Sequence, residues 1–302
     1  MRSRRDHLRS VVADANASIV CIQETKLSAI SPFLVSETLG ARFASFAYLP
    51  SVGASGGILV ACRGPEVCCT VMNSGRYSVT VAIVEANSEQ WVLTTVYGPQ
   101  PDIDKVEFLN ELRSIHNTLT GPWIVVGDFN LLLHASDKNN VNINRRNLGR
   151  FRRFVDDLQL KDIFLHGRRY TWSNERNTPT MERLDRVLVT VDWELNYPFF
   201  YLQALSSDFS DHCPLLLSTN ASFHTKRRFH FENWWIKIPG YLDAVQAGWV
   251  CNEDFADPLC RIDAKLKNMA KHLQSWSQRT VGQIKSQLLI ARTIVSWLDK
   301  AQ

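Results

Sequence analysis

An acid and an amide, Asp128 and Asn130, follow a short apolar run at residues 123–126 (Trp-Ile-Val-Val). Gly121-Pro122 and Gly127 bound this run, which predicts a buried strand that ends where the polar side chains begin. A carboxylate at the end of a strand is held rigidly while its oxygens stay accessible, and a general base or a metal ligand needs both. The alternative is a simple turn, because Asp and Asn favour turns through local hydrogen bonds.

Five further polar side chains lie in or at the ends of similar apolar runs: Glu24, Tyr97, Asp185, Asp211 and His212. Taken singly, Glu24 is also compatible with the start of a loop, Tyr97 with a half-buried rim position, and Asp211-His212 with a structural role. Asp185 lies in an alternating strand pattern, where an unpaired charge is costly. It therefore pairs either with a neighbouring arginine or with a catalytic group.

Together these side chains supply what phosphodiester hydrolysis requires. Magnesium prefers carboxylate oxygens and retained waters, and it neutralises phosphate charge. A carboxylate can accept the proton of the attacking water, and a histidine oriented by a carboxylate can donate to the phosphoryl oxygen. This chemistry depends on whether the fold brings the residues together.

The composition is that of an ordinary globular protein, with 302 residues of which 45% are apolar and 21% charged. The net charge of +4 does not indicate a particular class of binding partner. However, five arginines fall within nine residues that contain no acid: Arg145, Arg146, Arg150, Arg152 and Arg153. This cluster is either a solvated helix face or a contact to a nucleic-acid phosphate backbone.

The seven cysteines show no CxxC pair or Cys/His ladder, so we expect neither structural zinc nor a disulfide partner. No apolar stretch is long enough to span a bilayer, and the arginine-rich N-terminus lacks the apolar segment of a secretion signal. We therefore expect an intracellular protein of the nucleus or cytoplasm, with no membrane partner.

Hydrophobic spacing predicts a mixed α/β domain followed by a helical extension. The predicted domains are residues 1–219, a linker at 220–240, and helices over 241–302. Predicted helices cover residues 5–16, 31–39, 105–119 and 148–160, and predicted strands cover residues 18–22, 58–61, 78–84, 91–97, 123–126, 170–172, 183–190 and 215–217. The strands at 78–84 and 91–97 are expected to form a hairpin.

Five segments in order resemble the endonuclease/exonuclease/phosphatase superfamily: Gln-Glu-Thr at 23–25, Val-Tyr-Gly-Pro at 96–99, Gly-Asp-Phe-Asn at 127–130, Arg-Leu-Asp-Arg at 183–186 and Ser-Asp-His-Cys-Pro at 210–214. With Tyr-Thr-Trp-Ser-Asn at 170–174, the pattern resembles the apurinic-endonuclease-like domain of plant LINE-type, non-LTR retrotransposons. The resemblance spans roughly residues 18–218. It implies a four-layer αββα sandwich of two packed β-sheets flanked by helices, with the catalytic groups at one mouth.

The resemblance also implies roles for individual residues. Glu24 would bind Mg²⁺, for which Mn²⁺ is a possible substitute. Asp211 would assist metal binding or protonation of the leaving group. Asp128 would position or deprotonate the attacking water, supported by Asn130. His212, oriented by Asp185, and Tyr97 would contact the phosphate. Asn174 and Trp172 match a segment that lines the nucleic-acid face in relatives, and Arg145 and Arg146 are the candidate contacts to the DNA backbone.

Two departures from the family pattern stand out. Members begin with a strand carrying a Trp-Asn-like motif whose asparagine supports the metal site, whereas this chain begins Met1-Arg2-Ser3 without such a strand. We therefore expect an N-terminally truncated domain that lacks an inner strand. The Tyr-Gly-Pro segment, which usually continues into asparagine, continues here into Gln100. The aromatic and basic stretch 227–235 resembles the connector that precedes reverse transcriptase in such elements.

Three functions follow in order of preference. The first is a Mg²⁺-dependent endonuclease acting on DNA. The second is an inactive relic of a retrotransposon that folds and binds nucleic acid. The third is a phosphatase acting on a nucleotide or a phosphoinositide.

Overall fold

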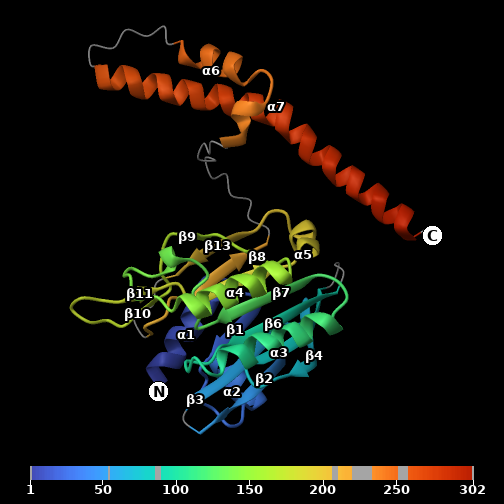
Figure 1. Cartoon of the computed structure of the whole chain (residues 1–302). Coiled ribbons are helices and arrows are strands. Elements are labelled where there is room, and N and C mark those ends of the chain that lie inside the picture. The colour runs from blue at the N-terminus through green and yellow to red at the C-terminus, as the bar shows by residue number, and fades with distance from the viewer. Residues whose placement is uncertain are drawn as a thin grey trace. The chain divides into compact units, whose positions relative to one another are not determined.

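The computed structural model describes residues 2–53, 55–85, 90–205, 210–219, 233–250 and 258–300. The chain divides into two units, Met1–Ser222 and Phe223–Gln302 (Figure 1). No helix among the described residues combines the length and the apolar character needed to cross a membrane.

The first unit alternates strands and helices along the chain. Its helices are α1 (Arg2–Asp14), α2 (Pro32–Leu39), α3 (Lys105–Thr118), the short 3₁₀ helix η1 (Ala135–Asp137), α4 (Arg145–Asp157) and α5 (Val191–Asn196). Its strands are β1 (Ile19–Gln23), β2 (Ser45–Val52), β3 (Ser55–Cys62), β4 (Val67–Ser74), β5 (Ser78–Glu85), β6 (Trp91–Tyr97), β7 (Trp123–Asp128), β8 (Lys161–Asp162), β9 (Leu165–His166), β10 (Trp172–Ser173), β11 (Met181–Glu182), β12 (Asp185–Val189), β13 (Tyr201–Ala204) and β14 (Leu215–Ser218).

One six-stranded sheet, ordered β4-β5-β6-β7-β12-β8, forms the centre of the described fold. Strands β5 and β6 are buried over almost their whole length, because layers cover both faces of this sheet. Two three-stranded sheets, β1-β3-β2 and β14-β13-β9, pack on one face through a shared apolar cluster. Helices α3 and α4 cover the other face.

Helices α1 and α2 pack on the outer face of the β1-β3-β2 sheet through a third apolar cluster. The layers therefore run from helices to sheet to sheet to helices, which confirms the predicted αββα class (Figure 1). Among the described residues, β1 pairs only with β3, and β14 pairs only with β13. The expected loss of a first strand stays a prediction.

The cap and the apolar stripe of α4 explain why this segment forms a surface helix. Asn144 caps it by accepting a hydrogen bond from the backbone N–H of Asn147 at 3.1 Å. Phe151, Phe154 and Val155 are buried along one stripe while the arginines occupy the opposite face. Through this buried stripe, α4 packs on the six-stranded sheet that carries Asp128.

Most predicted elements of the first unit exist, with shifted ends. The predicted hairpin is confirmed, because β5 and β6 pair antiparallel; its connecting residues 86–89 lie outside the described residues. Strand β7 continues through Gly127 to Asp128, so Gly127 does not break it as predicted. The predicted strand at 170–172 is wrong in its bounds, because only Trp172 and Ser173 pair there.

The second unit contains the 3₁₀ helix η2 (Asn233–Lys237), α6 (Tyr241–Trp249) and α7 (Pro258–Lys300). Trp235 and Tyr241 pack on Trp276 of α7, with ring centroids 5.8 and 6.0 Å apart. Asn268 donates to the carbonyls of Gly248 and Val250, which ties the end of α6 to α7. Much of the predicted linker and connector, residues 220–232, lies outside the described residues.

Candidate active site

Three polar side chains come together because their strands are neighbours in register. Strands β6 and β7 run parallel with Tyr97 opposite Asp128. Strand β12 runs antiparallel to β7 with Asp185 opposite Asp128. Because neighbouring strands lie about 4.8 Å apart, these three positions form one row across a sheet end.

Asp128 is the buried centre of this row, with 4% of its surface exposed. Asn130 holds both of its oxygens: the Asn130 backbone N–H donates to Oδ1 at 2.8 Å and its side-chain amide donates to Oδ2 at 3.0 Å. Burial, followed by repulsion from Asp185, raises the pKa of Asp128 to about 7, although His212 and the Asn130 amide oppose this shift. The carboxyl therefore exchanges a proton near neutral pH, as a general base must.

Asp185 pairs with a histidine, and no arginine in the described part of the chain forms an ion pair with it. Its Oδ2 lies 2.9 Å from Nδ1 of His212. Burial alone would lower the pKa of His212, but the hydrogen bond and charge of Asp185 outweigh it and raise this pKa to about 9. The imidazole therefore carries a positive charge at neutral pH and can donate through Nε2.

Glu24 reaches the same row from the facing sheet. The hydroxyl of Tyr97 donates to its carboxylate, and Lys26 lies 3.5 Å from its other oxygen. Burial, followed by this hydrogen bond, raises the pKa of Tyr97. Glu24 has φ 53° and Asn130 has φ 49°, a left-handed conformation that is uncommon outside glycine and concentrates at functional sites.

Gly127 allows the backbones of β6 and β7 to lie close together at this row. Its φ of 132° is unfavourable for other residues, and an added Cβ would lie 2.2 Å from the Val96 carbonyl oxygen. The same Cβ would lie 3.1 Å from Nε2 of Gln23, the last residue of β1. A side chain at position 127 would therefore clash mainly with the backbone of the neighbouring β6, and the Gln23 side chain of β1 would have to shift slightly.

The carboxylates at this row fit a cation that keeps most of its bound waters. Among the residues described, no group of three His, Cys, Asp or Glu side chains is arranged to enclose a metal ion. Mg²⁺, however, commonly binds through one or two carboxylates and keeps several waters. The Glu24 side chain is 44% exposed, so it is accessible to a hydrated ion. The negative charges of Asp185 and Glu24 contribute to the raised pKa of Asp128. A cation beside Glu24 would relieve this crowding of negative charge.

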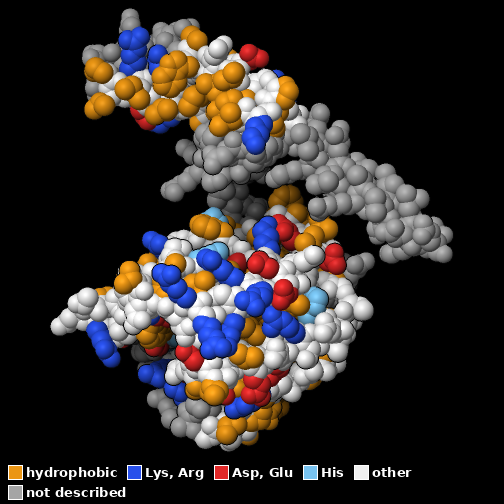
Figure 2. All heavy atoms as spheres, in the orientation of Figure 1, with side chains coloured by type: hydrophobic (Ala, Val, Ile, Leu, Met, Phe, Trp, Pro, Cys, Tyr) orange, Lys and Arg blue, Asp and Glu red, His pale blue; other side chains and the backbone are white. Residues whose placement is uncertain are grey.

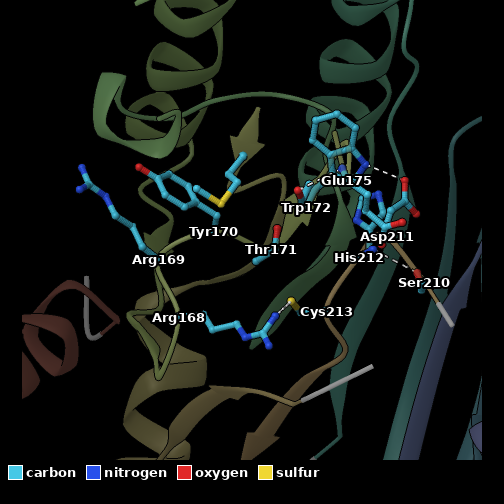
Figure 3. Close-up of a pocket in the computed structure, with 12 residues that line it drawn as sticks. Arg168, Arg169, Tyr170, Thr171, Trp172, Glu175, Ser210, Asp211, His212 and Cys213 are labelled. Atoms are coloured by element: carbon cyan, nitrogen blue, oxygen red, sulfur yellow. Dashed lines mark hydrogen bonds between the residues drawn. The ribbon is translucent and has the colours of Figure 1, made fainter. Parts of the chain in front are cut away.

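Trp172 and Asp211 lie beside the histidine, and Figure 3 shows them joined. The indole Nε1 of Trp172 donates to Asp211 at 2.8 Å, and Trp172 forms an isolated β-bridge with His212. The Asn174 side chain instead closes its own loop by accepting from the Thr180 backbone N–H at 3.0 Å. Asp211 thus orients Trp172 beside His212, while Asn174 lies in the loop after β10.

A pocket with a volume of about 370 Å³ opens next to His212. Residues 168–173 and 210–213, together with Glu175 and Met181, line it, and Asn174 is not among the lining residues (Figure 3). Among the lining residues, Arg168 donates to Sγ of Cys213 at 2.9 Å, and the Arg169 guanidinium lies 5.4 Å from the Tyr170 ring centroid. Aromatic and cationic groups therefore flank the histidine.

Arg145 and Arg146 stand apart from this row, at the exposed start of α4. The side chains of Asn144 and Asn147 donate to Asp102 at 2.7 and 2.6 Å, which holds the start of α4 beside the loop that follows β6. Figure 2 shows Lys and Arg side chains gathered over α4 and interspersed with acids. No described contact places the two arginines in the row of Asp128.

A buried ion network behind the row was not anticipated from the sequence. Arg186, with no exposed surface, donates to Asp137 and, at 2.7 Å, to Asp162. Asp137 also accepts from the backbone N–H groups of Leu133 and His134 at 3.0 and 2.7 Å. The available signal was an arginine directly after Asp185 in an otherwise apolar strand, which needs a buried acidic partner. The network fixes β12 next to the loop that follows β7.

Comparison with known proteins agrees with the fold. No curated protein matches the chain. The endonuclease domain of TRAS1, a telomere-specific non-LTR retrotransposon, matches with a TM-score of 0.53 and 15% identity over 73% of this chain and 96% of that one. An endonuclease/exonuclease/phosphatase family protein from Leptotrichia buccalis C-1013-b matches with a TM-score of 0.50 and 12% identity over 72% and 92%. The model of the endonuclease/exonuclease/phosphatase family matches residues 1–212, and the chain belongs to that family.

Proposed function

We propose that this protein is a Mg²⁺-dependent phosphodiester hydrolase that acts as an endonuclease on DNA. The observation that carries the proposal is the single row of Tyr97, Asp128 and Asp185, extended by Glu24 on one side and His212 on the other. It combines a carboxyl that titrates near pH 7 with a charged imidazole. Family membership supports hydrolysis of a phosphate ester.

The reaction assigns one task to each side chain. Asp128, held by Asn130, accepts the proton of the attacking water. His212, held by Asp185, donates from Nε2 to a phosphoryl oxygen, whose charge grows in the transition state. Glu24 would hold the cation, and Tyr97 orients Glu24 through its hydroxyl. Bound Mg²⁺ would neutralise the phosphate and stabilise the leaving oxygen.

The test is cleavage of supercoiled plasmid and of duplex DNA containing an abasic site. We expect Mg²⁺-dependent nicking that EDTA abolishes and that Asp128→Ala reduces about 10²–10⁴-fold, the typical contribution of a general base. Asp192→Ala serves as the control, because Asp192 is an exposed carboxylate at the start of α5 that belongs neither to the row nor to the arginine face of α4. Folded wild-type protein that cuts neither substrate in Mg²⁺ or Mn²⁺ would refute the enzyme assignment.

DNA as the substrate and an origin in a plant LINE-type retrotransposon belong to the same proposal. The ordered motifs at 23–25, 96–99, 127–130, 183–186 and 210–214 support this origin. The exposed arginines of α4 and the aromatic and cationic pocket beside His212 support a polyanionic partner with bases that stack. A nucleotide or phosphoinositide substrate is tested by including these phosphate esters in the same assay.

A second candidate function is nucleic-acid binding without cleavage. The exposed arginine face of α4, which lies away from the row, favours it. Under this alternative, salt-sensitive DNA binding persists in Asp128→Ala and falls in the double variant Arg145→Ala/Arg146→Ala. The endonuclease proposal requires nicking in addition to this binding, so the plasmid assay separates the two functions.

A further inference from the structure

Thr171 connects the two chain segments that supply the Asp185–His212 pair. It precedes β10, has no exposed surface, and is drawn with His212 among the residues that line the pocket in Figure 3. Its Oγ1 accepts hydrogen bonds from the backbone N–H groups of Leu184 and Asp185, at 3.0 and 3.1 Å. A side-chain oxygen therefore fixes the backbone on which the Asp185 carboxylate is carried.

The main chain of Thr171 holds the histidine side of the pair. Its carbonyl accepts from the backbone N–H of Cys213 at 2.7 Å, and its own N–H donates to the carbonyl of Glu182 at 2.9 Å. Cys213 directly follows His212, and the neighbouring Trp172 bridges to His212. One residue thus sets the distance between two segments that are 27 positions apart in the sequence.

We propose that Thr171 is a positioning residue whose hydroxyl oxygen sets the geometry of the Asp185–His212 hydrogen bond. Without this oxygen, two buried N–H groups lose their acceptor and the backbone at the start of β12 relaxes. The carboxylate of Asp185 then moves relative to Nδ1 of His212. The kinetic part of this role rests on the proposed hydrolysis, whereas the hydrogen bond itself can be measured without any activity.

The experiment compares isosteric variants of the full chain. Thr171→Val keeps the shape and removes the oxygen, and Thr171→Ser keeps the oxygen. Thr80→Val is the matched control, because Thr80 is also buried and loses a hydroxyl hydrogen bond, to Thr94 at 2.9 Å, away from His212. The first readout is the downfield imidazole Nδ1–H resonance of His212 in histidine-labelled protein, assigned by its absence in His212→Gln.

The second readout is kcat and KM for Mg²⁺-dependent hydrolysis of bis(p-nitrophenyl) phosphate. We expect Thr171→Val to lose or shift the Nδ1–H resonance and to lower kcat about 10–100-fold with KM nearly unchanged, because small displacements of a catalytic group have effects of this size. Thr171→Ser and Thr80→Val should retain the resonance, and Thr171→Ser should restore kcat.

Thr171→Val with a wild-type resonance and a wild-type kcat would overturn the assignment, as would an equal loss in Thr80→Val. If Thr171→Val does not fold, Thr171→Cys replaces it, since a thiol sulfur is only a weak acceptor. If wild-type protein hydrolyses nothing, the proposed function fails, and the resonance alone decides whether Thr171 positions the pair.

Discussion

Neutralising the buried Asp128 by Asp128→Asn should stabilise the fold at alkaline pH while it abolishes hydrolysis. Burial and the charge of Asp185 raise the pKa of Asp128 from 3.8 to about 7. Because folding raises this pKa, the Asp128 carboxyl contributes most favourably to stability below pH 3.8, the pKa in the unfolded chain. This contribution declines as the pH rises to about 7. Above that pH the loss is complete.

The size of the effect follows from the shift. About three pKa units correspond to roughly 4 kcal/mol, at 1.36 kcal/mol per unit. The asparagine can accept from only one of the two Asn130 donors, which costs about 1–2 kcal/mol. In the metal-free protein we therefore expect Asp128→Asn to be about 2–3 kcal/mol more stable than wild type at pH 8.5. Near pH 4 the variant should be equal to wild type or about 1 kcal/mol less stable.

Urea unfolding in EDTA, followed by tryptophan fluorescence at both pH values, measures this crossover. Asp211→Asn is the control, because its exposed carboxylate should give no comparable gain at pH 8.5. If Asp128→Asn is less stable than wild type at pH 8.5, the description of Asp128 as a desolvated acid crowded by other carboxylates is wrong.

Three more predictions follow from the same geometry. The rate kcat/KM should rise with pH up to about 7, as Asp128 loses its proton, and fall above about 9, as His212 loses its own; His212→Gln should lack the alkaline decline, and an unchanged decline would exclude His212 as the acid. Tyr97→Phe should raise the Mg²⁺ concentration for half-maximal rate about 10-fold, because an oriented carboxylate binds metal more tightly; an unchanged Mg²⁺ titration would contradict this role. Arg186→Ala should reduce the free energy of unfolding by about 3–5 kcal/mol, since it leaves buried acids unpaired; urea unfolding that changes by less than about 1 kcal/mol would contradict the network.

The sequence indicates the acids of the candidate site more readily than the residues that hold them. Glu24 and Asp128 were identifiable because each lies at the end of an apolar strand, where a polar side chain needs a reason. Thr171 carried no such signal, since its partners are backbone amides of a segment that is remote in sequence. The pairing of His212 with Asp185 was predicted only from the family resemblance, because local patterns do not encode which distant segments meet.

The same limit applies to the prediction of the fold. Long buried strands such as β5 and β6 were found from their apolar runs, whereas two-residue strands such as β8 and β9 exist only through pairing with distant neighbours. The αββα class came from resemblance of the motifs, because periodicity alone does not determine which faces of two sheets meet. The ends of elements were the least accurate part, as the extension of β7 to Asp128 shows.

Binding of Mn²⁺, followed by electron paramagnetic resonance, tests most directly whether one pocket seats a cation against a phosphate. We predict that each wild-type chain binds one ion, that a non-hydrolysable phosphodiester analogue tightens this binding, and that Glu24→Gln weakens it at least about 10-fold. Wild-type protein that binds no Mn²⁺, or binding that is the same in Glu24→Gln and indifferent to the analogue, would contradict the account.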